Sequence, residues 1–174
     1  GAGAGHWIDF YRETFNATYC MGIDISEPLV LKLSEKYLDQ ENVEILVNDI
    51  STDDFNLSRK FQIINAVGVL FHIVNDSKWL TALENLKGCL EDNGLIIVGG
   101  QFGLSTDDVQ FCKVDKFKSW KERKDAWDKF SNKATEEVLV NKRVRSLMDW
   151  QKASNQCGLE IIDVIRANKR KEIK

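Results

Sequence analysis

Histidine, proline and paired cysteine are scarce in this sequence. Its 174 residues include two histidines, one proline and four cysteines, and no two of the cysteines form a Cys-x-x-Cys pair. This scarcity argues against a zinc site, so we expect no bound metal. Scattered thiols in a chain of this length are typical of a reducing compartment, which predicts a cytoplasmic protein.

An excess of positive charge and long apolar runs are also missing. The chain carries 24 basic and 27 acidic residues, a net charge of −3. This balance gives no broad attraction to a phosphate backbone, so nucleic acid is not an expected partner. No apolar run approaches the roughly 20 residues that a membrane-spanning helix needs, so no membrane is expected either. Neither the charge balance nor the distribution of apolar residues indicates an oligomeric state.

The chain alternates short apolar runs with segments whose apolar side chains recur at helical spacing. Five runs predict strands, at residues 19–24, 43–47, 61–67, 95–98 and 159–165. Ser26 and Ser146 mark predicted helix starts, and Gly158 a helix end. Helices between almost fully apolar strands predict an α/β fold, with a mostly parallel sheet covered on both faces.

Glycines and acids follow the predicted strands, at the edge where parallel sheets bind ligands. The run GAGAG at 1–5 fits a tight turn into a helix, where missing side chains let a ligand approach the backbone. Asp24 ends the next strand, and its carboxylate can accept hydrogen bonds from both hydroxyls of a ribose. Asp49 ends the strand after that. Each also has a structural interpretation: close packing for the glycines, a helix cap for Asp24 and an Asx turn for Asp49.

Two classes of nucleotide site compete for this pattern. A nicotinamide or flavin site is typically built on Gly-x-Gly-x-x-Gly, but here the glycines run Gly-x-Gly-x-Gly and His6 follows them. A second acid such as Asp49 is also no part of that dinucleotide fingerprint. The pattern favours a different adenosine cofactor and keeps an NAD-type oxidoreductase as the alternative.

Together these segments resemble the class I S-adenosylmethionine-dependent methyltransferases. GAGAGHW resembles their glycine motif, GIDIS at 22–26 their ribose-binding strand end, and NDI at 48–50 their adenine-contacting turn. FQIINAVGVLFHI and LENLKGCLEDNGLIIV resemble their fourth strand, next helix and fifth strand. The resemblance implies a three-layer Rossmann-like methyltransferase fold.

The resemblance implies S-adenosylmethionine as the cofactor and places its contacts. The predicted contacts are Gly1, Ala2, Gly3 and Gly5 at the methionine moiety, Asp24 at the ribose with Ile25 beside it, Asp49 and Ile50 at the adenine, and Ala66 and Val67 beneath the cofactor. An acid facing a ligand cleft is not core. We therefore expect the loss of Asp24 to lower cofactor affinity and barely to affect folding.

The sequence departs from the family's pattern at both ends. The family places a strand and an acid just before its glycine motif, which here begins at Gly1, and a last antiparallel strand beyond the position of Lys174. We therefore expect this sequence to be an incomplete copy of the natural protein. Without the first strand, those that end near Asp24 and Ala66 would flank an empty slot. Within the chain, Gln62 replaces a usual acid, and Asp92-Asn93-Gly94 replaces a Pro-Gly-Gly turn.

Motifs of several acceptor classes are missing. Asn65-Ala66-Val67-Gly68 stands where adenine- and glutamine-modifying enzymes have an Asn/Asp-Pro-Pro-aromatic turn. We find no Pro-Cys nucleophile, no two-glutamate hairpin and no set of acids after the fourth strand. This leaves methyl transfer to an oxygen or nitrogen of a small-molecule acceptor. A fold that binds the cofactor without turnover is a second alternative.

We predict one methyltransferase domain over residues 1–174. Residues 1–100 form its cofactor-binding half, 101–145 a substrate lid or insertion, and 146–174 the final helix and strand. An aromatic stripe in the lid is interpreted as core rather than pocket wall: Trp120, Trp127 and Phe130. Basic residues at its end are interpreted as a solvated face rather than a site for an acidic substrate group: Lys142, Arg143 and Arg145.

His72 is the one histidine predicted near the reaction. Imidazole titrates near neutral pH, so His72 is the candidate catalytic base for a hydroxyl acceptor. Phe71 and Ile73 flank it with apolar surface, and a neutral imidazole there needs only one backbone partner. We favour a packing role over base catalysis.

Overall fold

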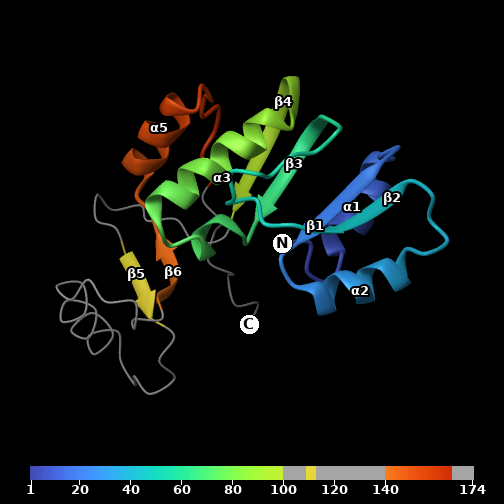
Figure 1. The fold of residues 1–174 in the computed structure, drawn as a ribbon. Helices are drawn as coiled ribbons and strands as arrows, with labels where there is room; N and C mark the ends of the chain where they lie inside the picture. Colours follow the sequence, from blue (N-terminus) through green and yellow to red (C-terminus); the bar gives the residue numbers. More distant parts are fainter. Residues whose placement is uncertain (100–108, 113–139, 166–174) are drawn as a thin grey trace, which may run out of the picture.

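The protein alternates helices and short strands along the chain (Figure 1). The computed structural model describes residues 1–99, 109–112 and 140–165. In chain order the elements are α1 (His6–Phe15), β1 (Cys20–Asp24), α2 (Glu27–Lys36), β2 (Val43–Val47), β3 (Phe61–Val67), the 3-10 turn η1 (Leu70–His72), α3 (Asp76–Gly88), β4 (Leu90–Gly99), β5 (Val109–Cys112), β6 (Val140–Val144) and α5 (Leu147–Gln156). No helix within these ranges is long and apolar enough to cross a membrane.

Four of the strands form two parallel pairs. β1 lies beside β2, with Cys20 opposite Val43 and Asp24 opposite Val47, and β3 lies beside β4. Parallel neighbours need a crossover, and α2 and α3 provide the two crossovers. Within the described residues β1 and β3 are not hydrogen bonded to each other, so the predicted parallel sheet is present as two pairs. The α/β architecture predicted from the alternation is confirmed.

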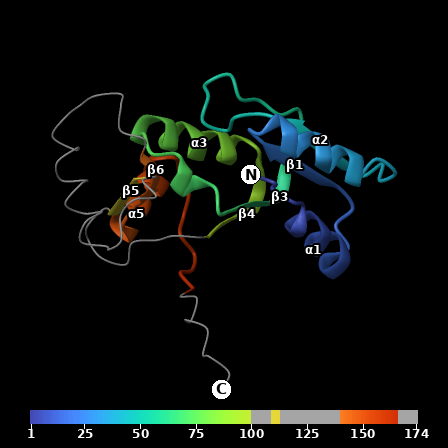
Figure 2. The ribbon, with the colours of Figure 1, turned by 90° about the horizontal axis from the view of Figure 1, so that it is seen from below.

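Two apolar clusters hold the helices on the strands. α1 and α2 meet through Ile8, Leu33 and Tyr37. α3 and α5 share a larger cluster, in which the rings of Trp79 and Trp150 meet edge-on with centroids 4.8 Å apart. In both views α1, α2 and β1 lie at one end of the molecule and α3 and α5 at the other, with β3 and β4 between them (Figures 1 and 2).

The helix starts agree with the sequence, but one of them works differently. Ser26 is the N-cap residue of α2, yet its side chain makes no capping hydrogen bond. Its N–H instead donates to Asp24 Oδ1 at 3.0 Å. α5 starts with a complete capping box, in which the Ser146 hydroxyl accepts from the N–H of Asp149 and the Asp149 carboxylate accepts from the N–H of Ser146. Gly158 ends α5 with φ +68, the left-handed conformation predicted for it.

The prediction of a last strand at residues 159–165 is wrong. No described strand pairs with this stretch, and a strand forms only beside a partner. Its apolar residues remain largely exposed, with Ile162 72% and Ile165 86% accessible. Conversely, the predicted lid contains an unpredicted antiparallel pair of strands, β5 and β6. The predicted aromatic stripe of the lid lies outside the described residues.

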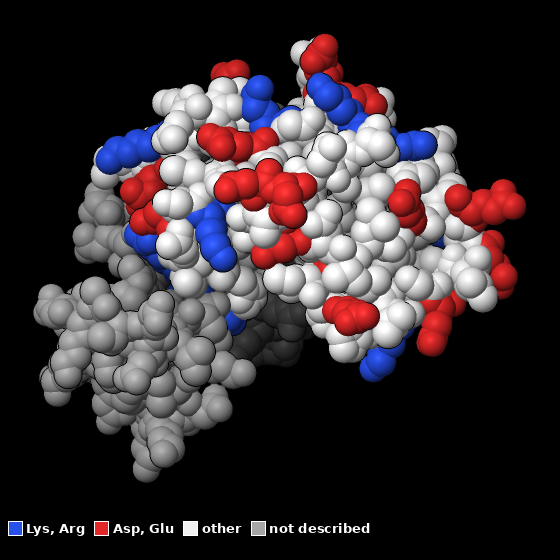
Figure 3. Space-filling view, viewed as in Figure 1, with Lys and Arg blue, Asp and Glu red and all other residues white. Residues whose placement is uncertain are grey.

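Charges of both signs are interspersed over the face shown in Figure 3. This distribution agrees with the overall balance of 24 basic and 27 acidic residues. Neighbouring charges of opposite sign largely cancel at a distance, so this face offers little long-range attraction to a charged partner.

Candidate functional site

A hydrogen-bonded cradle joins the glycine turn to the carboxyl end of β1. The N–H of Gly3 donates to Asp24 Oδ2 at 3.0 Å, and the N–H of Ala2 donates to the Ile23 carbonyl at 2.9 Å. The other oxygen of Asp24 accepts from Ser26. One carboxylate therefore orders the end of β1, the start of α2 and the glycine turn that precedes α1.

Asp24 is more deeply enclosed than the sequence predicts. Only 7% of the residue is exposed. Burial raises the pKa of its carboxyl, but hydrogen bonds from the amides of Ser26, Gly3 and Ile25 and the positive charge of the Gly1 amine together outweigh this, so the pKa lies below its usual 3.8. The sequence-based expectation is that its loss would barely affect folding; the two part-buried amides that it accepts from argue for a larger effect, which the stability of an Asp24 variant would measure.

The glycine turn packs against the turn after β3, and each turn has a glycine with open space beside it. Gly3 and Gly68 both have positive φ, +54 and +81, and a β carbon at either would meet no atom within 4 Å. Gly1 packs so closely on the segment after β3 that its β carbon would lie 2.6 Å from Val69 Cγ2. The structure thus brings together the predicted contact regions at 1–5, 22–26 and 66–68.

Two residues that the sequence did not single out hold the glycine turn from α2. The Tyr37 hydroxyl has two acceptors in reach, Asp9 Oδ1 at 2.7 Å and the Gly5 carbonyl at 3.0 Å. Lys36 Nζ donates to Asp9 Oδ2 at 2.6 Å and to the Ala4 carbonyl at 3.3 Å. Burial and the hydrogen bond to Asp9 raise the pKa of Tyr37. In the sequence Tyr37 is one more member of an apolar stripe, so only its position in space shows this role.

The turn after β2 closes on itself around Asp49. Asp49 Oδ1 accepts from the N–H of Ser51 at 2.9 Å and from its hydroxyl at 2.7 Å. This is the Asx turn given as the structural interpretation of Asp49. Asn85 of α3, also unpredicted, donates from Nδ2 to the carbonyls of Ile50 at 2.9 Å and Thr52 at 2.8 Å. The predicted adenine-contacting turn is thus held from two sides: by Asp49, which follows β2, and by Asn85 on α3, the helix that connects β3 to β4.

The remaining predicted residues lie along the end of β3. Ala66 is buried, and the N–H of Val67 donates to Asn65 Oδ1 at 2.9 Å. His72 is exposed at the end of η1, with its ring 4.3 Å from that of Phe71, centroid to centroid. It does not line the pocket found beside these strand ends.

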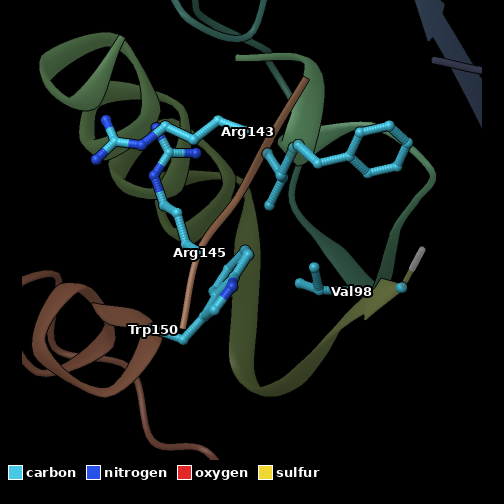
Figure 4. A pocket seen from close by; sticks show the side chains of 7 residues that line it. Val98, Arg143, Arg145 and Trp150 are labelled. Carbon is cyan, nitrogen blue, oxygen red and sulfur yellow. The ribbon is translucent and has the colours of Figure 1, made fainter. Parts of the chain in front are cut away.

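That pocket lies at the carboxyl ends of β3 and β4 (Figure 4). Its lining residues are Leu70, Phe71, Val98, Gly99, Arg143, Arg145 and Trp150. Figure 4 shows the side chains of Arg143, from β6, and Arg145, from the residue after it, on the same side of the chain, with Trp150 of α5 beside the base of Arg145. A wider cavity of about 180 Å³ adjoins the same two arginines and is also lined by Asp76 and Trp79.

The two arginines are packed rather than solvated. The side chain of Arg145 is 2% exposed and that of Arg143 17%, so their interpretation as a solvated face is wrong. Arg145 stacks its guanidinium 4.1 Å from the Trp79 ring centroid, and both arginines pair with Asp76. Burial raises the pKa of Asp76, but the two guanidinium groups outweigh this and hold it below the usual value.

These residues fit an adenosine-containing cofactor. A carboxylate at a strand end can bind the ribose diol, and the space beside Gly3 and Gly68 leaves room for the ligand. Ile25 exposes 69% of its surface next to Asp24, as suits an apolar side chain that a bound base or ribose would cover. No three metal-ligating side chains come together in the part of the chain that the structure describes.

Comparison with known proteins agrees with the resemblance. A family model described as a methyltransferase domain matches residues 1–94. Among solved structures, an S-adenosylmethionine-dependent methyltransferase from Clostridium acetobutylicum is similar with a TM-score of 0.67 and 15% identity, over 99% of this chain and 76% of that one. The CcbJ methyltransferase from Streptomyces caelestis has a TM-score of 0.60 and 16% identity, over 94% and 72%. A search of curated protein sequences gives no match.

One similar structure is named for a different kind of reaction. A protein titled a pericyclic reaction enzyme has a TM-score of 0.56 and 15% identity, and covers 91% of this chain. The chain spans only 36% of that enzyme's length. At such identities a shared fold is the conclusion, and the Rossmann-like methyltransferase fold predicted from the sequence is confirmed. Because the family model matches more than half of the chain, the protein belongs to the methyltransferase domain family.

Proposed function

We propose that this protein binds S-adenosylmethionine and transfers its methyl group to an oxygen or nitrogen of a small-molecule acceptor. The observation that carries the proposal is the cradle of Gly3, Asp24 and Ser26, which presents an ionised carboxylate beside an open glycine turn. Three described thiols, Cys20, Cys89 and Cys157, are unpaired. Unpaired thiols suit a reducing cytoplasm, where we place the reaction.

The chain's part in the reaction is orientation. Asp24 binds the ribose hydroxyls, and the turn of Asp49 and Ile50 contacts the adenine. Bound S-adenosylmethionine would supply a methyl group on a positively charged sulfur. The acceptor's oxygen or nitrogen would form its bond to that methyl carbon as the carbon–sulfur bond breaks, with S-adenosylhomocysteine as the leaving group and the acceptor's proton passing to water. We place the acceptor beside the cofactor at the carboxyl ends of β3 and β4, the edge at which parallel sheets bind ligands. Holding two reactants in line removes much of the entropic barrier to such a displacement.

Calorimetric binding tests the cofactor. We expect S-adenosylmethionine and S-adenosylhomocysteine to bind and NAD not to bind. Asp24→Ala should weaken binding, while Asp54→Ala, an exposed acid outside the cradle, should not. Binding of NAD, or equal affinities for the two variants, would contradict the proposal.

A cofactor-binding protein without methyl transfer is the second candidate. The similarity to a pericyclic reaction enzyme favours it, because the same fold there is named for a different reaction. Incubation with a methyl-labelled cofactor and a panel of small hydroxyl and amine acceptors separates the two. Label in an acceptor supports methyl transfer, whereas tight cofactor binding with label in no acceptor supports the second candidate.

A further inference from the structure

Asn85 is a polar residue on a helix that otherwise packs through apolar side chains. Its neighbours Leu83 and Leu86 are buried in the cluster of α3 and α5. The side-chain nitrogen of Asn85 donates to two carbonyls of the turn after β2, those of Ile50 and Thr52. An amide nitrogen carries two protons, so both are used on this one turn.

These hydrogen bonds fix the orientation of the peptide groups in the turn. The peptide group that joins Ile50 to Ser51 is held at both ends, because its carbonyl accepts from Asn85 and its N–H donates to Asp49 Oδ1. Asn85 also donates to the carbonyl of Thr52, two residues further along the chain. This second hydrogen bond holds the far side of the turn against α3. The turn therefore depends on a side chain from the other strand pair for its shape.

The turn leaves one donor and one acceptor for a ligand. Among the described residues, none accepts from the N–H of Ile50 and none donates to the second oxygen of Asp49. The edge of adenine offers the opposite pair, an amino group that donates and a ring nitrogen that accepts. Hypoxanthine reverses both groups, since it has a carbonyl and a ring N–H in their places. A rigid turn therefore distinguishes the two bases.

We propose that Asn85 is a positioning residue that determines base specificity. By holding the carbonyls of Ile50 and Thr52 it keeps the Ile50 N–H and the Asp49 carboxylate in the geometry that selects adenine over hypoxanthine. The inference rests on the proposed function, because it assumes that an adenosine cofactor occupies the cradle. If Asn85 served only folding, its loss would lower stability and leave the choice between bases unchanged.

The test compares two ligands on the same preparation of protein. Affinities for S-adenosylhomocysteine and S-inosylhomocysteine are measured by calorimetry for the wild type, Asn85→Ala and Asn155→Ala. Asn155 is an exposed asparagine of α5 and makes the matched control. The ratio of the two affinities is the quantity compared between variants. A lower folded fraction reduces both affinities by the same factor and therefore leaves their ratio unchanged.

We expect the wild type and Asn155→Ala to prefer the adenine ligand about tenfold or more, as one or two hydrogen bonds provide. Asn85→Ala should lower this ratio to about threefold or less. If that variant does not fold, Asn85→Gln, which keeps the amide but displaces it, should also lower the ratio. An unchanged ratio overturns this inference alone, whereas a wild type that binds neither ligand overturns the proposed function as well.

Discussion

Replacing Asp24 with alanine should affect folding and cofactor binding together. The change removes the acceptor of two hydrogen bonds, each 3.0 Å long, from the amides of Gly3 and Ser26. A hydrogen bond to an ionised acceptor contributes about 1.5–3 kcal/mol, and partial access of water to the freed amides offsets some of the loss. We expect the free energy of unfolding to fall by about 2–4 kcal/mol, and cofactor affinity to fall by a similar amount.

The effect of Asp24 on stability should depend on pH in a defined direction. Its pKa in the folded protein lies below the usual 3.8. At pH values between these two pKa values the carboxylate is still charged in the folded state, whereas the unfolded chain has already bound a proton. The stabilisation is therefore complete above about pH 5 and is lost as the pH falls through the folded-state pKa. The difference in stability between the wild type and Asp24→Ala should shrink over that range.

Urea unfolding followed by tryptophan fluorescence measures both quantities. Asp54→Ala is the control, because Asp54 is exposed and lies outside the cradle. A variant at Asp24 that unfolds at the wild-type urea concentration at pH 7 would refute the view that its carboxylate orders the glycine turn. A destabilised variant with unaltered S-adenosylhomocysteine affinity, corrected for its folded fraction, would refute the ribose assignment.

Three further substitutions test other parts of the site. Gly5→Ala should lower the free energy of unfolding by about 2 kcal/mol or more, because Gly5 has φ +81 and a β carbon there would lie 2.5 Å from the Tyr37 hydroxyl oxygen; thermal unfolding checks this. Arg145→Lys should destabilise by about 1–2 kcal/mol, because an ammonium cannot replace the planar stack on Trp79; equal stability to the wild type would argue that the stack is dispensable. His72→Asn should retain most turnover and its pH profile, and a loss of roughly 100-fold would instead identify His72 as the base.

The positions of the predicted cofactor contacts follow from the sequence because topology fixes them. Parallel strands joined by helices end at one edge, so an acid or glycine after each strand must lie near the others. This reasoning placed Asp24 and the glycine turn correctly relative to each other. It did not show that the Asp24 carboxylate would itself accept from Gly3, because a hydrogen-bond partner depends on the exact path of the turn.

The contacts that hold the site had no signal in the sequence. Tyr37 and Asn85 lie on helices far along the chain from the turns they contact, and each fits an ordinary helical pattern. Arg145 belongs to a basic run of the kind that is commonly solvated, yet it is buried because Trp79 and Asp76 converge on it. The failed strand at 159–165 shows the same limit, since apolar composition specifies a strand only when a neighbour is present to pair with it.

The length of α2 matters because both of its ends contact the same cradle. The helix has ten residues, or about 15 Å, between the N-cap Ser26, which Asp24 holds, and Tyr37, which holds the Gly5 carbonyl. Inserting one residue would turn Tyr37 by about 100° around the helix axis and carry its hydroxyl away from Gly5. Related chains are therefore expected to vary in length after Tyr37, in the turn that leads to β2, and to keep the spacing from Ser26 to Tyr37 constant.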